Sequence, residues 1–363
     1  MKQRYYTLKK ILGLKALYNI IYGERGNGKT TAVILHGIDK HFTDKSEMAI
    51  IRRWEIDFQA KRGQGMFDSD VIREHVVKGS KGEWTDVFFR SMRWYFCRYD
   101  EDGNRVLSER PFCYAFSLNS MQHDKSTNYP YIKTILFDEF LEKGGKYLVD
   151  EFQLFTNTLS TIIRDKEDVT IFMCANTVSR FAPYWREMGI KADKQKQGTI
   201  DIYQYGQSTC TVAVEYCAAT DSSLKGSNKY FAFDNPKLKM ITEGAWELDI
   251  YPHLTIKYRP ADVMYQFFIK FNGEIYHCEI INHDTGNFIY VHQKTSEIKD
   301  EDNDLIYSLE YDTRCNWIRK INKPVNTLSK RIWELFCADK VCYQDNFVGD
   351  SINNYINQCI SKK

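Results

Sequence analysis

A glycine-rich loop constrains this chain more than any other feature. Residues Gly23 to Thr31 read GERGNGKTT and match the phosphate-binding pattern G-x-x-x-x-G-K-[ST] at every fixed position. An apolar run at 17–22 precedes the loop, and residues 31–38 follow it with apolar side chains at helical spacing. A chance match is the alternative interpretation, and the flanking strand and helix count against it. The sequence therefore predicts an α/β domain built around this loop.

Each residue type in the loop has a chemical reason to be there. Three glycines let the backbone turn its N–H groups inward around a polyphosphate, and the positive end of the following helix favours the anion. We expect Lys29 to reach the β- and γ-phosphates and the Thr30 hydroxyl to ligate Mg²⁺. The residues predicted to bind the nucleotide are Gly23, Glu24, Arg25, Gly26, Asn27, Gly28, Lys29, Thr30 and Thr31.

A second anchor is an apolar strand at 131–139 that ends in adjacent carboxylates, Asp138 and Glu139. In phosphate-loop NTPases we expect such a strand to lie beside the loop strand, where its terminal aspartate faces the water shell of Mg²⁺. Asp138 is assigned that role. Glu139 is predicted to polarise the water that attacks the γ-phosphate. Alone, an apolar strand that ends in Asp-Glu is weak evidence for a nucleotide site. In a chain that also has a phosphate loop, it is strong evidence for one.

Two further polar sites follow predicted strands. The buried run at 169–175 ends in Asn176, whose amide is predicted to hydrogen-bond the γ-phosphate or the attacking water. The alternative is a strand-end turn that happens to use Asn. Arg52 and Arg53 follow a short strand at 47–51, where they would contact nucleotide or DNA, or would form a solvated surface pair.

Length and composition limit the remaining possibilities. The 363 residues, 43% of them hydrophobic, are long for one domain and suffice for two. The ten cysteines are scattered without zinc-ligand spacing and are predicted to be reduced thiols in a cytosol. Neither a signal peptide nor a membrane span is expected. The net charge of +2 gives no global attraction to nucleic acid, so such binding has to come from local patches or from assembly into a ring.

Strand and turn patterns assign the rest of the first domain. Residues 60–130 are predicted to be β-rich, with a hairpin in which 93–99 faces 111–116 across a turn at 100–104. The polar segment 122–128 is predicted to be a surface loop. A short amphipathic packing helix is expected within residues 1–16.

The domain boundary is predicted from a change in composition. Strands at 199–203 and 210–216 are expected to complete a motor domain over residues 1–219. A linker rich in Ser, Gly and Asn follows at 220–229, and a second domain at 230–363.

The second domain is predicted to begin with an antiparallel meander of strands at 265–271, 274–281 and 287–292. A basic stretch with interleaved aromatic residues follows: Arg314, Trp317, Arg319, Lys320, Lys323, Lys330, Arg331 and Trp333. Such a stretch binds nucleic acid or forms a helix pair with a solvated basic face, and the second interpretation is favoured.

With both nucleotide motifs in place, the sequence resembles the DNA-packaging (encapsidation) ATPases of phi-twenty-nine-like podophages, which are related to terminase large subunits. The resemblance rests on the loop at 23–31, the acidic strand at 135–139, Asn176, the total length and a small β-rich domain after the ATPase. It implies an α/β fold with a RecA-like, additional-strand (ASCE) P-loop NTPase core. A smaller β-rich, RNase H-like domain with a vestigial nuclease is expected to follow.

The same resemblance implies a function and partners. Members of this family hydrolyse ATP with Mg²⁺ and push double-stranded DNA into a prohead, in the cytoplasm of the infected host cell at the portal vertex. A homo-oligomeric ring, expected to be a pentamer, docks on the portal, and in part of the family a structural RNA sits between motor and portal. The alternatives are a ring helicase on the same ATPase core and a nucleotide-gated scaffold with little turnover.

The resemblance also implies cations that act on the neighbouring subunit's nucleotide. Arg164 follows a predicted helix at 148–163, where the family's arginine finger lies, and Lys125 matches a second trans-acting cation. Arg180 is a rival finger, and either arginine is otherwise a surface charge.

Related terminases carry an RNase H-like nuclease in which clustered acids hold two metal ions. Here Glu274, Glu279 and Asp284 lie on or near the meander, but no aspartate is clearly placed in the middle of a strand. The second domain is therefore predicted to lack nuclease activity and to dock on the portal or on a structural RNA.

Overall fold

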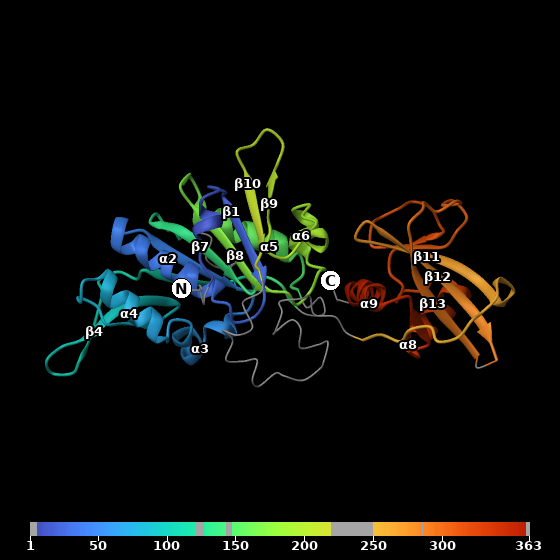
Figure 1. Ribbon diagram of the computed structural model, residues 1–363, viewed down its shortest axis with the longest axis horizontal. Helices are drawn as coiled ribbons and strands as arrows, with labels where there is room; N and C mark the ends of the chain where they lie inside the picture. Colours follow the sequence, from blue (N-terminus) through green and yellow to red (C-terminus); the bar gives the residue numbers. More distant parts are fainter. Residues whose placement is uncertain (1–5, 121–126, 143–146, 219–249, 285, 361–363) are drawn as a thin grey trace. The chain divides into compact units, whose positions relative to one another are not determined.

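The computed structural model describes residues 6–120, 127–142, 147–218, 250–284 and 286–360, which fall into two compact units (Figure 1). The described part of the first unit ends at residue 218, and that of the second begins at residue 250. The predicted linker at 220–229 lies outside the described residues, so the limits of the two domains stay a prediction. None of the described helices has the length and apolar character needed to cross a membrane.

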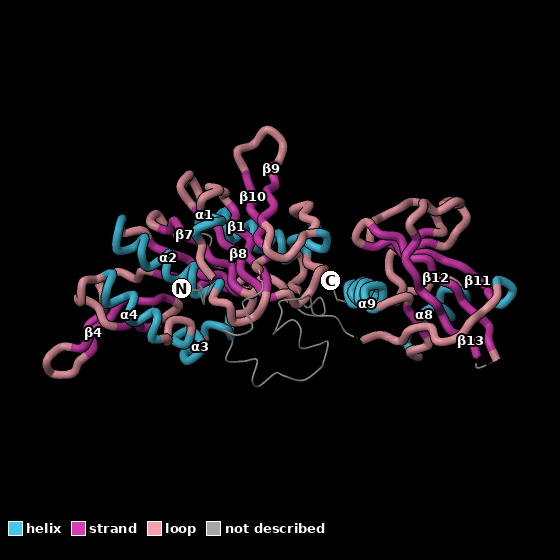
Figure 2. Tube along the Cα trace, viewed as in Figure 1, coloured by secondary structure: helices cyan, strands magenta, loops and turns pink. Residues whose placement is uncertain are grey.

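A ten-stranded mixed sheet forms the centre of the first unit (Figure 2). Its order is β3-β4-β6-β2-β7-β8-β1-β10-β9, with β5 paired to β4. The strands are β1 Tyr18–Gly23, β2 Glu47–Arg52, β3 Asp86–Arg90, β4 Arg93–Tyr99, β5 Arg105–Leu107, β6 Cys113–Ser117, β7 Ile132–Asp138, β8 Thr170–Asn176, β9 Ile200–Gln204 and β10 Thr211–Tyr216. The run β6-β2-β7-β8-β1-β10 is parallel throughout. This mostly parallel sheet confirms the predicted α/β, RecA-like core.

The prediction that the acidic strand lies beside the loop strand is wrong, because β8 lies between them. Gly23 of β1 is in register with Asn176 of β8, and Asp138 of β7 with Cys174 of β8. The five residues 171–175 of β8 are all buried, as a strand with a partner on each side requires. This inserted strand is the additional strand of the predicted fold class, and it brings Asn176 against the phosphate loop.

Helices cover both faces of the sheet. Successive strand residues point to opposite sides, and in the central strands the side chains on both sides are apolar and need cover. Ile20 and Ile21 of β1 are both fully buried, Ile20 in the core that contains α5 and α6, and Ile21 in the core that contains α1, α2 and α4. The helices are α1 Lys9–Leu12, α2 Lys29–Asp44, α3 Ala60–Gly65, α4 Asp70–Gly79, α5 Glu151–Ile163 and α6 Pro183–Glu187, with short 3₁₀ helices at 55–58 and 192–194. These two cores hold the carboxyl ends of the central strands at a single edge.

Residues 60–130 are less β-rich than predicted, since they include helices α3 and α4. The predicted facing of 93–99 and 111–116 is confirmed in part, since the start of β4 pairs antiparallel with β6. The predicted connection is wrong, because the turn at 100–104 joins β4 to the short β5. The Asp100 carboxylate accepts a 2.7 Å hydrogen bond from the backbone N–H of Asn104 and closes the turn early. On its other side β6 runs parallel to β2.

Two smaller predictions fall at the margins of the described chain. The amino-terminal helix α1 spans Lys9–Leu12, which is shorter than the helix expected within 1–16. Of the predicted surface loop at 122–128, residues 122–126 lie outside the described residues.

The second unit contains a six-stranded mixed sheet in the order β15-β14-β11-β12-β13-β16. Its elements are β11 Val263–Phe271, β12 Glu274–His283, β13 Gly286–Lys294, β14 Ile306–Ser308, β15 Trp317–Ile318, β16 Val341–Tyr343, α8 Thr327–Cys337, α9 Asn346–Ile360 and a 3₁₀ helix at 260–262. The predicted antiparallel meander is β11-β12-β13, and parallel strands extend it on both sides. This mixed sheet agrees with the predicted β-rich, RNase H-like second domain.

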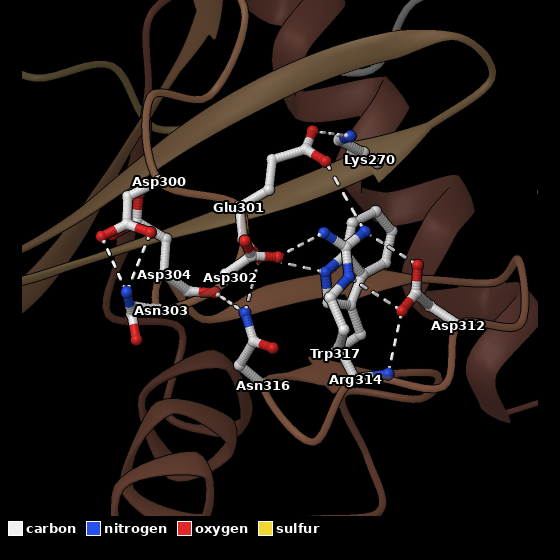
Figure 3. A network of polar contacts seen from close by, with 10 residues as sticks. All are labelled: Lys270, Asp300, Glu301, Asp302, Asn303, Asp304, Asp312, Arg314, Asn316 and Trp317. Carbon is white, nitrogen blue, oxygen red and sulfur yellow. Dashed lines mark hydrogen bonds and ion pairs between the residues drawn. The ribbon is translucent and has the colours of Figure 1, made fainter.

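The beginning of the predicted basic stretch is a packed network rather than a helix with a solvated face (Figure 3). Arg314 donates to Asp312 at 2.9 Å, and Lys270 donates to Glu301 at 2.5 Å. The two cations lie 4.6 and 4.8 Å from the ring centre of Trp317. These contacts occupy the first residues of the stretch, and the helix α8 begins only at Thr327. On α8 the basic residues Lys330 and Arg331 are exposed, as the favoured interpretation expects, and nucleic-acid binding by the stretch stays the untested alternative.

Candidate nucleotide-binding site

A cleft of about 820 Å³ lies at the carboxyl ends of the central strands of the first unit. Ligands bind at this edge of open α/β sheets, because the loops that follow the strands converge there. Its walls are formed by the phosphate loop, α2, the end of β2 and the segment 6–8. Ten of the predicted site residues line the cleft together: Arg25, Gly26, Asn27, Gly28, Lys29, Thr30, Thr31, Asp138, Glu139 and Asn176.

The phosphate loop adopts a backbone that depends on its glycines. Gly28 caps the amino end of α2 with a φ of +89°, a left-handed conformation that residues with a side chain rarely adopt. At Gly23 a Cβ atom would lie 2.9 Å from the Cβ of Cys217, which is too close for a side chain. Because α2 begins at Lys29, its positive amino end faces the cleft.

The ammonium group of Lys29 is buried at the base of the loop, where the residue keeps 5% of its surface exposed. Its Nζ donates to the Glu24 carbonyl at 2.7 Å, to Asn27 Oδ1 at 3.2 Å and to Asn176 Oδ1 at 3.4 Å. Burial lowers the pKa of Lys29. All three of these hydrogen-bond acceptors are neutral oxygens, so the arrangement favours an anion that would supply the counter-charge.

Thr30, Asp138 and Arg52 form a chain of polar contacts across the cleft. The Thr30 hydroxyl donates to Asp138 Oδ1 at 2.7 Å, and Arg52 Nη2 donates to Asp138 Oδ2 at 2.5 Å. Arg52 is half-buried, and its Nη1 also lies 3.4 Å from Glu139 Oε2. The sequence analysis left Arg52 open between nucleotide contact and a surface pair, and it missed this bridge. The available signal was a basic residue directly after a short apolar strand, which does not identify the carboxylate partner.

Glu139 follows β7 and faces the cleft with a backbone φ of +58°, which non-glycine residues rarely adopt. Although 61% of its side-chain surface is exposed, partial desolvation raises the pKa of its carboxyl group. Arg52 opposes this shift, and the nearby Asp138 charge adds to it. Glu139 is therefore a carboxylate whose proton affinity is increased by its surroundings, as a general base requires.

Arg53 is not a surface charge but anchors the segment that follows the acidic strand. Its guanidinium group donates to both carboxylate oxygens of Glu151, at 2.7 and 2.8 Å, and to the Phe140 carbonyl at 2.9 Å. Tyr184 donates a further 2.7 Å hydrogen bond to Glu151. This buried pair ties β2, α5 and α6 to the backbone immediately after Glu139, so it holds that residue in place.

Comparison with known proteins identifies the family. Residues 1–216, which end with the last residue of β10, match the podovirus DNA encapsidation protein (Gp16) family. The chain belongs to this family. The DNA packaging proteins of Bacillus phages PZA and phi29 are each 27% identical to it over 203 residues, which cover 54% of this chain and 53% of each relative. The chain thus spans about half the length of the curated relatives it matches.

Solved structures of packaging motors share the fold of this Gp16-family chain. A structure of the Phi-28 gp11 DNA packaging motor gives a TM-score of 0.55 at 16% identity and covers 99% of both chains. The bacteriophage Phi-29 viral genome packaging motor assembly gives 0.58 at 18% identity, over 96% of this chain and 97% of the other. At these identities the likeness concerns the fold, and it extends over both units.

The cations that the Gp16-family resemblance implies lie at different edges of the sheet. Arg164 ends α5 before β8 begins, and the seven residues of β8 span about 20 Å, so this junction lies at the edge opposite the phosphate loop. Its guanidinium donates to the Thr127 carbonyl at 3.0 Å. Arg180 follows the carboxyl end of β8, on the same edge as the loop. Lys125 lies outside the described residues.

Proposed function

We propose that the chain is an ATP-hydrolysing double-stranded DNA translocase that packages a viral genome through the portal of a prohead. The observation that carries this proposal is the chain of polar contacts from Thr30 through Asp138 and Arg52 to Glu139. These residues line the same cleft as the buried Lys29. Membership in the encapsidation family and the names of the relatives support DNA packaging as the work coupled to this site.

The residues of the cleft fit ATP with Mg²⁺. Lys29 supplies a buried cation for the β- and γ-phosphates, and the amino end of α2 adds backbone N–H donors. Thr30 and Asp138 already share a 2.7 Å hydrogen bond, and together they would hold Mg²⁺. When bound, the metal ion neutralises charge on the phosphate oxygens.

Two side chains of the cleft are assigned to the hydrolytic step. Glu139 accepts the proton of the attacking water, and Arg52 keeps its carboxylate ionised and oriented. Asn176 contacts Lys29 across the β1–β8 pairing, so its amide is placed to respond when the γ-phosphate leaves.

The proposed assembly is a homo-oligomeric ring, expected to be a pentamer, on the portal in the cytoplasm of the infected cell. Arg164 is proposed to serve a neighbour's site in this ring, because it lies too far from its own phosphate loop to act there. Lys125 is proposed as a second such cation, and a structural RNA as a further partner at the portal.

Steady-state ATPase assays on the full chain test this proposal. Lys29→Ala is expected to abolish ATP binding, whereas Glu139→Gln keeps binding and loses about 10²-fold or more in kcat. Exposed residues provide matched controls, Lys40→Ala in α2 and Glu83→Gln in a turn, and both are expected to behave as wild type. Near wild-type turnover in Glu139→Gln would show that another group activates the water.

The nucleic acid used in the assay separates the proposal from its alternatives. Stimulation of turnover by double-stranded DNA, together with density at one vertex of proheads in electron micrographs, is expected for a packaging motor. Preference for single strands with unwinding of a duplex would indicate a helicase. Negligible turnover with and without DNA would indicate a nucleotide-gated scaffold.

A further inference from the structure

Three metal-ligating side chains meet on one face of the sheet in the second unit. His277 of β12 lies directly opposite His292 of β13, and Glu279 lies two residues after His277, so the three side chains share a face. One ligand atom from each lies within 4.8 Å of the others. Glu279 is buried, and both histidines are half-buried.

The hydrogen bonds of the cluster leave lone pairs facing one another. The Nδ1 of His292 lies 3.4 Å from the Gln293 carbonyl, which can only accept, so Nδ1 carries the proton there. In the neutral ring Nε2 is then a lone pair, yet it lies 3.5 Å from Glu279 Oε2. That oxygen already accepts a 2.5 Å hydrogen bond from the Tyr258 hydroxyl. Two acceptors at this distance call for a cation between them, which is either a proton on Nε2, giving an ion pair, or a metal ion.

His277 gives an independent indication of a missing ligand. Its Nε2 is buried and has no hydrogen-bond partner, which is costly for a polar atom. The ring is stacked on Phe268 with its centre 5.0 Å away, and its centre lies 4.8 Å from that of His292. The imidazole is thus held next to the other two groups with a nitrogen still to be satisfied.

We propose that His277, Glu279 and His292 bind a single divalent transition-metal ion of the zinc class. Two imidazole nitrogens and one carboxylate oxygen suit Zn²⁺ and disfavour Mg²⁺ and Ca²⁺, which prefer oxygen ligands. Tetrahedral zinc with bonds of 2.0–2.1 Å separates its ligand atoms by about 3.4 Å. The 3.5 Å between His292 Nε2 and Glu279 Oε2 matches that separation. A fourth ligand such as water would complete the tetrahedron.

The groups around the cluster are those that orient metal ligands. Tyr258 fixes the Glu279 carboxylate, and the Gln293 carbonyl fixes the tautomer of His292. The bound ion cross-links β12 to β13 and, through Tyr258, to the segment that precedes β11. It therefore stabilises the second unit, whatever the activity of the first.

The test is metal binding by the metal-stripped full chain, measured by competition with a chromophoric zinc chelator. One Zn²⁺ per chain is expected. His277→Phe and His292→Phe keep the ring volume and remove a ligand, and Tyr258→Phe removes an orienting partner, so each is expected to weaken binding at least about 10-fold. His283→Gln, at the end of β12 outside the cluster, serves as the control and is expected to bind as wild type.

Cobalt spectroscopy separates this site from exposed thiols, since Cys315 and Cys337 are exposed in the same unit. Co²⁺ bound at the proposed site is expected to give d–d bands without a thiolate charge-transfer band, and Glu279→Gln is expected to change those bands. Circular dichroism checks that each variant is folded. Absence of stoichiometric binding, binding unchanged in folded His277→Phe and His292→Phe, or a thiolate band in the wild type would each overturn the proposal.

Discussion

Arg52 is the residue through which the two carboxylates of the cleft influence each other. It donates to Asp138 and lies beside Glu139, whose pKa is raised by desolvation and lowered by the Arg52 charge. A general base acts as the carboxylate, so hydrolysis is lost as the pH falls through the pKa of Glu139. Removing the arginine therefore moves that loss to higher pH.

We accordingly predict that Arg52→Gln shifts the acidic limb of the kcat–pH profile to higher pH and lowers kcat at neutral pH by roughly tenfold. Arg52→Lys retains a positive charge and is expected to keep most of the wild-type profile. The measurement is kcat between acidic and neutral pH at saturating ATP, with Lys40→Gln as the exposed control. An acidic limb that does not move in Arg52→Gln would mean that Glu139 is not the group that titrates.

At the scale of elements, the Arg53–Glu151 pair joins the end of β2 to α5. Both side chains are almost fully buried, with 3% and 0% of their surface exposed. Removing one partner leaves a charge buried without its counter-ion, which costs more than the pair itself contributes.

We predict that Arg53→Met destabilises the first unit by about 3–5 kcal/mol. The double variant Arg53→Met, Glu151→Gln is expected to recover part of this loss, because no buried charge remains. Chemical denaturation of the full chain followed by circular dichroism measures both, and Arg62→Met, whose side chain is 61% exposed, is the control. Equal stability of Arg53→Met and wild type would contradict the anchoring role.

The sheet of the second unit bears on the predicted absence of nuclease activity. Of the acids considered from the sequence, Glu274 accepts from Gln293 at 2.7 Å, and Glu279 contacts His292 and Tyr258. Among the described residues, the one group of three metal-ligating side chains is His277, Glu279 and His292, which contains a single carboxylate. Two-metal nucleases need several carboxylates to hold both ions.

We therefore predict that the purified full chain does not nick supercoiled plasmid with Mg²⁺ or Mn²⁺. Agarose electrophoresis of the plasmid after incubation measures this, with a restriction enzyme as the positive control. Nicking that disappears in Glu279→Ala would contradict the prediction.

Local chemistry explains which elements the sequence predicted. The phosphate loop, the strand ending in Asp138 and the meander each depend on neighbouring residues, so patterns of spacing and turn residues were sufficient. The place of β8 between β1 and β7 depends on packing between distant segments, which no local pattern records. The same holds for Arg52 and Arg53, whose carboxylate partners lie 86 and 98 residues away along the chain.

At the scale of the whole molecule, the position of Arg164 decides whether one subunit suffices for rapid hydrolysis. It lies at the edge of the sheet where β8 begins, and β8 spans about 20 Å from there to the edge that carries the phosphate loop. A cation contributes to hydrolysis only when it reaches the charge that develops on the γ-phosphate. If Arg164 contributes, it has to do so at a neighbour's site, which makes each active site the product of two subunits.

We predict that Arg164→Ala lowers kcat by about 10³-fold or more while nucleotide affinity stays near wild type, the effect typical of a lost arginine finger. Mixing tests whether the residue acts in trans. Rings that combine Arg164→Ala subunits with Lys29→Ala subunits are expected to regain ATPase activity wherever an intact loop faces an intact arginine.

The same mixing experiment with Lys125→Ala and with Arg180→Ala, each combined with Lys29→Ala, identifies which cation serves the interface. Arg180 follows β8 on the loop's own edge, so its variant is expected to show no recovery. Absence of recovery with Arg164→Ala, in mixed rings confirmed by native mass spectrometry, would assign that arginine a structural role within its own subunit.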